Sequence, residues 1–183
     1  MVYVFLADGF EEIEALACVD ILRRAEIPVS TVSVNGTNSV TGSHNIQVIA
    51  DILASDVDIN IVECAVYPGG MPGAETLSSG KDNTPSVIAK HCVENDILVG
   101  AICAAPLVLG RLSLLENKKA TCYPGFESEL KGATATGERV TVDGNIVTGR
   151  GPGCSVDFAL ELVSKLKGEK LALSIRKAMQ CDE

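Results

Sequence analysis

Cys103 occupies a position in the sequence where a thiol could act as a nucleophile. It follows the apolar run Ile97–Ile102, which predicts a buried strand, and it precedes a short helical segment, Ala104–Gly110. A sharp strand-to-helix turn forces its central residue into a strained conformation and tolerates only small neighbours, such as the alanines that flank Cys103. Helix N-termini favour negative charge, so we expect the pKa of this thiol to lie below its usual ~8.5. Simple core packing is the alternative role for such a cysteine.

Glu14 is the best candidate for a group that orients or protonates this thiol. A helical pattern runs from Glu11 to about Ala25, after the first strand. Four apolar residues define the expected buried arc of this helix: Ile13, Leu16, Ala17 and Ile21. Glu14 falls just beyond the edge of that arc, so we expect a partly desolvated carboxyl with a raised pKa that could shuttle a proton. Glu11 and Glu12 should point further away, as solvated first-turn carboxylates that favour the helix dipole.

The other cysteines and the histidines offer weaker candidates. Cys122 lies in a loop after a short strand and could approach the site, whereas Cys154 opens a helix and could be moderately acidic. There are only two histidines, His44 and His91, and we expect His91 on the surface, so a Cys–His dyad is thinly supported. No Cys/His cluster has zinc spacing, and we expect neither a metal nor a cofactor. Three cysteines are expected to pack the core: Cys18, Cys64 and Cys92.

Two glycine-rich loops follow predicted strands. The loop 68–73 contains Gly69 and Gly70 and exposes backbone N–H groups, which can form an oxyanion hole or simply an ordinary turn. The spacing from Gly73 to Lys81 does not match the phosphate-binding P-loop. The loop 149–153 lacks the spacing of a dinucleotide-binding fingerprint, so nucleotide binding is not expected at either loop.

The elements that must position these residues alternate between strands and helices. This alternation predicts an α/β fold, with a parallel sheet covered by helices on both faces and with functional loops where the strands end. Asp143-Gly144 predicts one β-hairpin, and no repeat or linker interrupts the chain, so we expect one domain over residues 1–183. The predicted strands are 2–7, 28–34, 47–49, 63–67, 97–102, 139–142 and 145–148, and the predicted helices are 11–25, 86–94, 104–110, 154–167 and 169–179.

Charge and hydropathy exclude several classes of partner. The net charge of −9 disfavours binding to nucleic acid, and no basic run suits an acidic membrane surface. The apolar N-terminal run is too short to span a bilayer and lacks the basic start of a signal peptide. Seven scattered cysteines without an export signal indicate thiols in a reducing compartment, so we expect a cytoplasmic protein.

Four motifs, in this order along the chain, resemble the ThiJ/PfpI superfamily in its DJ-one branch. Each motif is weak alone, but together they cover almost the whole chain and are highly specific. The motifs are GFEEIEA at 9–15, YPGGMPGA at 67–74, GAICAAP at 100–106 and TGRGPGCSVDFAL at 148–160.

The resemblance implies a flavodoxin-like three-layer sandwich and a homodimer. It makes Cys103 the nucleophile and the oxidation-sensitive residue, and Glu14 the carboxyl that hydrogen-bonds the sulfur. The backbone N–H groups of Gly70 and Ala104 correspond to the oxyanion donors. The loop around Pro152 resembles the part that reaches toward the dimer partner's site.

The sequence departs from the family pattern at positions that could contact substrate or partner. Tyr123 stands where the human-type branch has a histidine, and His44 stands where that branch often has an arginine. With Gly69 and Pro152, these residues form the group whose role at the substrate or the interface is open. The branches with peptidase or chaperone character place a histidine directly after the nucleophile, and Ala104 at that position argues against a peptidase.

Three functions follow from the resemblance. The first is a cysteine-dependent glyoxalase or protein deglycase, which acts on methylglyoxal-type dicarbonyls or on glycated proteins without glutathione. The second is a non-catalytic redox sensor or chaperone that responds through oxidation of Cys103 to a sulfinate held by Glu14. The third, a role in the synthesis of a thiamine precursor, has little support because no phosphate-binding motif is present.

Overall fold

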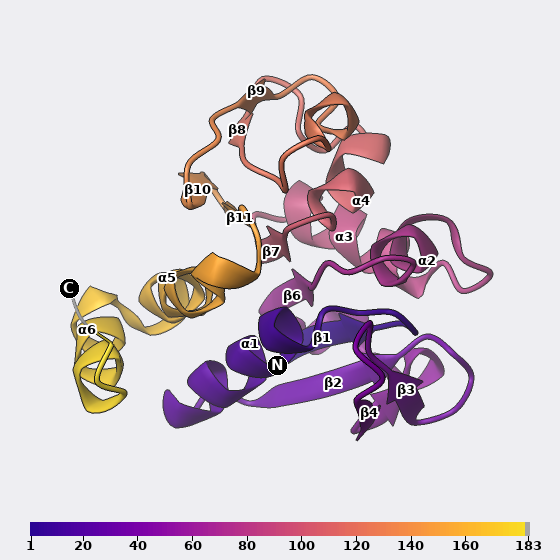
Figure 1. The fold of residues 1–183 in the computed structure, drawn as a ribbon, viewed down its shortest axis with the longest axis horizontal. Helices are drawn as coiled ribbons and strands as arrows, with labels where there is room; N and C mark the ends of the chain where they lie inside the picture. Colours follow the sequence, from indigo (N-terminus) through magenta and orange to yellow (C-terminus); the bar gives the residue numbers. More distant parts are fainter. Residues whose placement is uncertain (182–183) are drawn as a thin grey trace.

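A central seven-stranded sheet organises the computed structural model, which describes residues 1–181 (Figure 1). Its strands are β1 (Val2–Leu6), β2 (Val29–Ser33), β5 (Ile52–Leu53), β6 (Cys64–Tyr67), β7 (Leu98–Ile102), β10 (Val140–Asp143) and β11 (Ile146–Gly149). Their order is β10-β11-β7-β6-β1-β2-β5, and only the β10–β11 pair is antiparallel. The predicted mostly parallel sheet with one hairpin is therefore confirmed, although the hairpin turn lies one residue later, at Gly144-Asn145.

Helices cover both faces of the sheet and complete three layers. Figure 1 shows β6 and β7 between α5 on one side and α3 on the other. One layer contains α1 (Glu12–Arg24), α5 (Ser155–Lys167) and α6 (Glu169–Ala178), and the other contains α2 (Gly73–Ser79), α3 (Thr84–Glu94) and α4 (Pro106–Arg111). Within residues 1–181, every helix is too short or too polar to cross a membrane.

Strand β1 shows why an apolar run becomes a central strand. Its side chains alternate between two separate cores, with Val2, Val4 and Leu6 in one and Tyr3 and Phe5 in the other. All five residues of the strand are buried. Because the pleat sends successive side chains to opposite faces, a strand covered by helices on both sides must be apolar at every position.

Several short elements were not predicted. The expected extended piece β4 (Gln47–Ile49) pairs with an unforeseen strand, β3 (Ser39–Thr41), to form a separate antiparallel hairpin. The helix α2 was also missed, because its glycine-rich start favours a loop in the sequence. The short strand expected before the loop of Cys122 is β8 (Lys119–Ala120), which is confirmed. The remaining short elements are β9 (Thr134–Ala135) and 3₁₀ turns at Ala54–Asp56, Ile59–Ile61, Glu127–Glu129 and Pro152–Cys154.

The cysteines divide as the sequence indicates. All seven are free thiols. Cys18, Cys64 and Cys92 are 0% exposed and belong to the two cores, which confirms their packing role. Cys103 and Cys122 are also largely buried, but they lie where strands end and loops begin.

Candidate active site

Cys103 lies at the turn between β7 and α4 in a left-handed backbone conformation. Its φ is +65°, a value that is rare for a residue with a side chain and that confirms the strained turn. The turn is fixed by two hydrogen bonds of 2.8 Å, from the N–H of Cys103 to the carbonyl of Gly149 and from the N–H of Tyr123 to the carbonyl of Cys103. Helix α4 begins at Pro106 rather than at Ala104, because proline suits the first position of a helix.

Glu14 approaches Cys103 from the first turn of α1. Its side chain is 0% exposed, and its Oε2 accepts a hydrogen bond of 2.7 Å from the N–H of Gly69. An added Cβ at Gly69 would lie 2.7 Å from Cys103 Cβ and 2.8 Å from Glu14 Oε2, so both side chains crowd the same point. Within the described residues, the buried Oε1 of Glu14 has no hydrogen-bond partner of standard geometry, which leaves it available to the thiol.

The predicted buried face of α1 is confirmed at Ile21, which is 0% exposed, but is wrong in the first turns of the helix. Ile13 and Leu16 are 58% and 39% exposed, whereas Glu12 and Glu14 are 4% and 0% exposed. The first turn of α1 lies beneath the loops at the ends of the strands, where backbone N–H groups and His44 meet the carboxylates. Hydrogen bonding at this position outweighs the apolar pattern.

Burial couples the protonation of Glu14 and Cys103. Loss of solvent raises the pKa of Glu14 to about 7, as the sequence predicts in direction. Burial is the main cause that raises the pKa of the Cys103 thiol, and the negative charge of Glu14 is the second. The prediction of a lowered thiol pKa is therefore wrong for the state in which Glu14 is ionised. With the proton on Glu14, the charge that opposes a thiolate is removed. The two groups therefore act as one proton-sharing pair.

Backbone N–H groups face the sulfur from two loops. Those of Gly70 and Ala104 interact with the sulfur of Cys103 and lower the pKa of its thiol, against the effect of burial. Gly70 has a φ of +85°, and an added Cβ would lie 2.4 Å from backbone atoms of Gly9 and Glu11. Only glycine can bring the chain this close to the β1–α1 loop. The two predicted oxyanion donors thus lie together at the sulfur.

A pocket of about 260 Å³ opens over Cys103. The predicted residues Gly70, Ala104, Tyr123 and Pro152 line it together with Cys103. Gly69 does not line the pocket, and its N–H donates a hydrogen bond to Glu14. The pocket also contains three residues that were not singled out in the sequence: Glu11, Met71 and Phe126. Met71 belongs to the glycine-rich loop 68–73, and Glu11 opens the predicted helix 11–25, whereas no feature of the sequence indicated Phe126.

His44 does not line this pocket and instead pairs with Glu12. Its Nδ1 lies 2.8 Å from Glu12 Oε2, and its N–H donates to Glu12 Oε1 at 2.7 Å. Burial opposes the charge of Glu12, but the hydrogen bonds from His44 and Ser43 outweigh it and lower the pKa to about 2. The ligand atoms of Glu11, Glu12 and His44 lie within 4.8 Å of one another, which would suit a metal ion. The Glu12–His44 ion pair accounts for this cluster without one.

The other two loop cysteines lie outside this pocket. Cys122 is 5% exposed, and burial raises the pKa of its thiol to about 11. Cys154 donates toward the carbonyls of Gly151 and Arg139 at 3.1 and 3.0 Å. The N–H of Gly151 also donates to this sulfur at 3.4 Å.

The fold and the site together define a class of protein. It is an α/β sandwich whose cysteine stands on a strained strand-to-helix turn beside a buried carboxyl. Comparison places the molecule within that class: the chain belongs to the DJ-1/PfpI family, whose model matches residues 1–165.

Individual relatives agree with this assignment. The chain is 38% identical over 175 residues to Protein DJ-1 homolog B of Arabidopsis thaliana, covering 95% of this chain but only 40% of that relative. The structure of oxidized Toxoplasma gondii DJ-1 is 35% identical with a TM-score of 0.91, covering 98% of this chain and 97% of that one. That of Drosophila melanogaster DJ-1beta is 30% identical with a TM-score of 0.92, covering 100% and 98%. The predicted flavodoxin-like sandwich is confirmed.

Proposed function

We propose that the protein is a cysteine-dependent enzyme of carbonyl stress, which converts methylglyoxal-type dicarbonyls to hydroxy acids without glutathione. The observation that carries this proposal is the strained Cys103 turn, which directs the sulfur into a pocket beside the buried carboxyl of Glu14. A nucleophile with an adjacent proton carrier and two N–H donors suits addition to a carbonyl. The same chemistry would act on early glycation adducts of proteins.

The reaction needs no external oxidant or reductant. The sulfur of Cys103 adds to the aldehyde carbon of methylglyoxal, and the resulting oxyanion takes a proton to give a hemithioacetal. Glu14 accepts the proton from that carbon and returns one to the neighbouring carbon, which turns the hemithioacetal into a thioester of lactate. Water then cleaves the thioester, releasing lactate and restoring the thiol. The N–H groups of Gly70 and Ala104 stabilise the oxygen anion at each addition.

The pKa of Glu14 suits this task. At about 7 it lies near neutrality, where a carboxyl can both accept and donate a proton efficiently. An ordinary solvated glutamate, with a pKa of roughly 4.3, is a weaker base and would accept the proton from carbon less readily. Burial of Glu14 beside Cys103 therefore supports proton transfer rather than simple charge pairing.

Consumption of methylglyoxal by the purified protein tests the proposal. We expect lactate as the product, loss of turnover in Cys103→Ala, and a strong loss in Glu14→Gln with the fold retained. Removing a positioned general acid–base typically costs about 10²–10⁴-fold in rate. Cys122→Ala is the matched control, because its thiol lies outside the pocket. Turnover that survives in Cys103→Ala refutes the assignment.

Redox sensing by the same cysteine is a second candidate. The observation in its favour is that a close structural relative is described as oxidized. The N–H groups of Gly70 and Ala104, together with a protonated Glu14, could also hold the oxygens of an oxidised sulfur. The two candidate functions use the same atoms. In the first, Cys103 turns over a carbonyl substrate, whereas in the second, oxidation of Cys103 is itself the signal.

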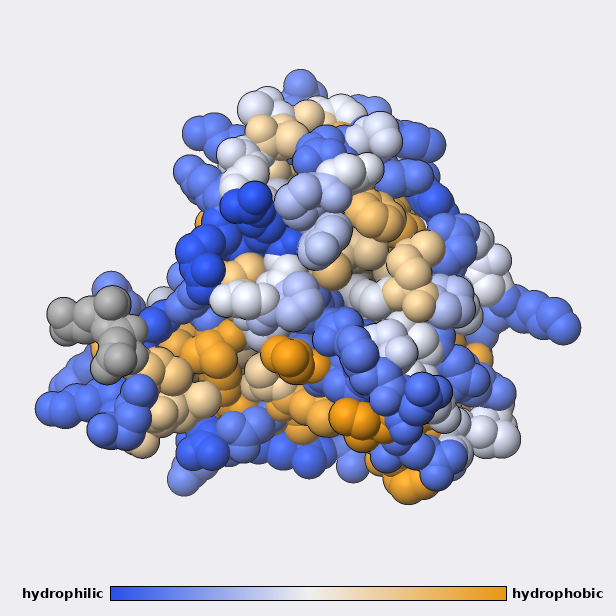
Figure 2. Space-filling view, viewed as in Figure 1, coloured by the Kyte–Doolittle hydropathy of each residue, from blue (hydrophilic) through white to orange (hydrophobic). Residues whose placement is uncertain are grey.

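We also propose that the protein forms a homodimer through the exposed side of α1 and the β3–β4 hairpin. Ile13 and Leu16 on α1, and Ile46 and Ile49 at the hairpin, are between 39% and 71% exposed. Figure 2 shows exposed apolar side chains over the region that α1 and β4 occupy in Figure 1. Apolar patches of this kind mark protein interfaces. Light scattering after chromatography should give twice the chain mass for the wild type and less for Ile13→Glu.

A further inference from the structure

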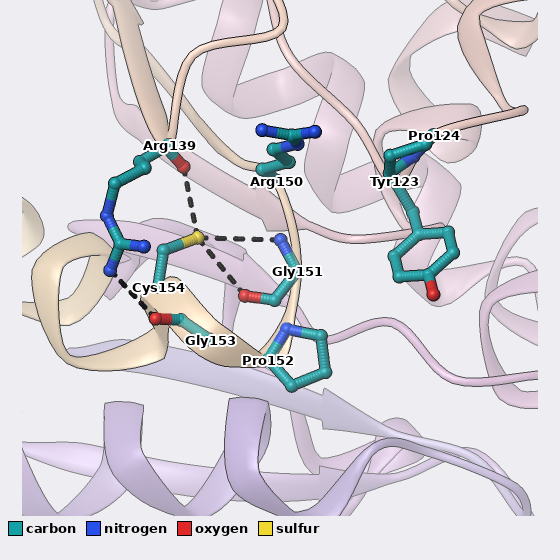
Figure 3. A pocket seen from close by; sticks show the side chains of 8 residues that line it. All are labelled: Tyr123, Pro124, Arg139, Arg150, Gly151, Pro152, Gly153 and Cys154. Carbon is teal, nitrogen blue, oxygen red and sulfur yellow. Dashed lines mark hydrogen bonds between the residues drawn. The ribbon is translucent and has the colours of Figure 1, made fainter.

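A second pocket of about 240 Å³ lies next to the one over Cys103 (Figure 3). The two pockets share Tyr123 and Pro152 as lining residues. Residues 150–154, which follow β11, form the floor of the second pocket, and Tyr123 stands across from them. A molecule held by Cys103 could therefore extend past Tyr123 into this second space.

Positive charge dominates the second pocket. Its lining contains two arginines, Arg139 and Arg150, and no acidic side chain. Arg150 is exposed, and its guanidinium has no ion-pair partner among residues 1–181. Arg139 shares the single carboxylate of Asp157 with Arg176, at 2.7 and 2.6 Å. Two guanidinium groups therefore share one carboxylate, and the third guanidinium, that of Arg150, has no ion-pair partner among residues 1–181, in a chain whose net charge is −9.

The backbone holds this pocket in place. Arg139 also donates to the carbonyl of Gly153 at 2.8 Å, and its own carbonyl accepts hydrogen bonds from the thiol of Cys154 and the N–H of Arg150. These bonds connect the start of β10 to the loop after β11, as Figure 3 shows in part. The Tyr123 ring packs on the same loop, since an added Cβ at Gly151 would lie 3.1 Å from Tyr123 Cδ2. A preformed pocket loses little entropy when a ligand binds.

We propose that the second pocket binds the carboxylate or phosphate group of a carbonyl compound whose aldehyde reacts with Cys103. Guanidinium groups bind carboxylate and phosphate oxygens with paired hydrogen bonds, and both anions would suit Arg139 and Arg150. The preferred substrates are then anionic oxoaldehydes rather than neutral methylglyoxal or basic glycated peptides. Because it takes Cys103 as the reacting group, this substrate class rests on the carbonyl chemistry proposed for the site.

Alkylation of Cys103 by matched reagents tests this directly. The reagents are the maleimide derivatives of acetate, propionate and butyrate, each paired with its uncharged amide, so that three lengths sample the reach from the sulfur to the arginines. Peptide mass spectrometry gives the rate at Cys103 alone. We expect one length of acid to react about two- to fivefold faster than its amide, within the range for a partly exposed charge contact.

Variants separate a local contact from the overall field of the protein. Arg150→Gln and Arg139→Gln should each reduce the preference for the acid, and Arg150→Lys should retain part of it. Lys90→Gln removes the same charge from an exposed position on α3 and should leave the preference intact. Equal rates for acid and amide at all three lengths overturn the proposal. A preference for the acid that falls as much in Lys90→Gln as in the arginine variants also overturns it.

Competing anions identify the group that binds. At equal ionic strength, inorganic phosphate should slow the reactive acid more than acetate if the natural group is a phosphate, and acetate should slow it more if the group is a carboxylate. Slowing by neither anion overturns the proposal. Alkylation needs no turnover, so the anion preference and the consumption of methylglyoxal can succeed or fail independently.

Discussion

Glu14, in the first turn of α1, and Cys103, at the turn after β7, converge on Gly69. The Gly69 N–H binds Glu14 Oε2 at 2.7 Å, and the space beside its Cα is closed by Cys103 Cβ and by that same oxygen. Gly69 is therefore a spacer between nucleophile and carboxyl. Its lack of a side chain lets the two groups approach closely enough to share a proton.

Gly69→Ala should separate this pair. The added methyl group would lie 2.7 Å from Cys103 Cβ, 2.8 Å from Glu14 Oε2 and 2.9 Å from the carbonyl oxygen of Ile102, which belongs to the rigid β7 backbone. We expect the free energy of unfolding to fall by about 1–3 kcal/mol, the range for overpacking, and alkylation of Cys103 to change in rate. Gly153→Ala is the matched control, because a Cβ there meets no atom within 4 Å. Denaturant unfolding that leaves both variants equal to the wild type contradicts the spacer role.

Glu14→Gln should change how stability depends on pH. The folded state raises the pKa of Glu14 from 4.5 to about 7, so it holds the proton more tightly than the unfolded chain. The stability that this proton confers is present at low pH and is lost as pH rises from about 4.5 through 7, by about 3 kcal/mol. Glutamine cannot ionise, so the variant should gain stability relative to the wild type over that interval. A difference between the two proteins that stays constant with pH contradicts the raised pKa.

The sequence predicts the parts of the site that depend on local pattern. A buried strand that runs directly into small residues and Pro106 predicts the Cys103 turn, because that conformation is determined by the residues next to it. The glycines of the loop 68–73 likewise predict exposed N–H groups after β6. Each central strand is a continuous apolar run, so the positions of these strands along the chain could also be predicted.

The sequence does not predict which side of α1 is buried. Counting apolar residues placed Ile13 and Leu16 inside, whereas the structure buries Glu12 and Glu14. The partners that make this burial favourable, Gly69 and His44, are 55 and 32 residues away. Contacts over such distances in sequence leave no periodic signal. Neither arginine of the neighbouring pocket, Arg139 or Arg150, was predicted from the sequence, because that pocket forms only where the start of β10 meets the loop after β11.

The titration of His44 should report its pairing with Glu12. The hydrogen bond that His44 donates to Glu12 is the largest of the effects that raise the pKa of His44, followed by the charges of Glu11 and Glu12. The stabilisation from the charged histidine is present below its unfolded pKa of about 6.5 and is lost as pH rises through the higher folded value. Proton NMR should therefore show a lower His44 pKa in Glu12→Gln than in Glu11→Gln, and a lower value in Glu11→Gln than in the wild type. The reverse order contradicts the direct pairing.

Oxidation by dilute peroxide should reach Cys103 before any other cysteine. Its sulfur lines an open pocket, whereas Cys18, Cys64 and Cys92 are 0% exposed. Each peroxide transfers one oxygen to the sulfur and leaves as water, so two equivalents give the sulfinate. Peptide mass spectrometry should show a mass gain of two oxygens at Cys103 first, and more slowly in Glu14→Gln, which cannot supply or accept the proton. Earlier oxidation of Cys122 would show that access to the pocket, and the N–H groups within it, do not control the reactivity of the thiols.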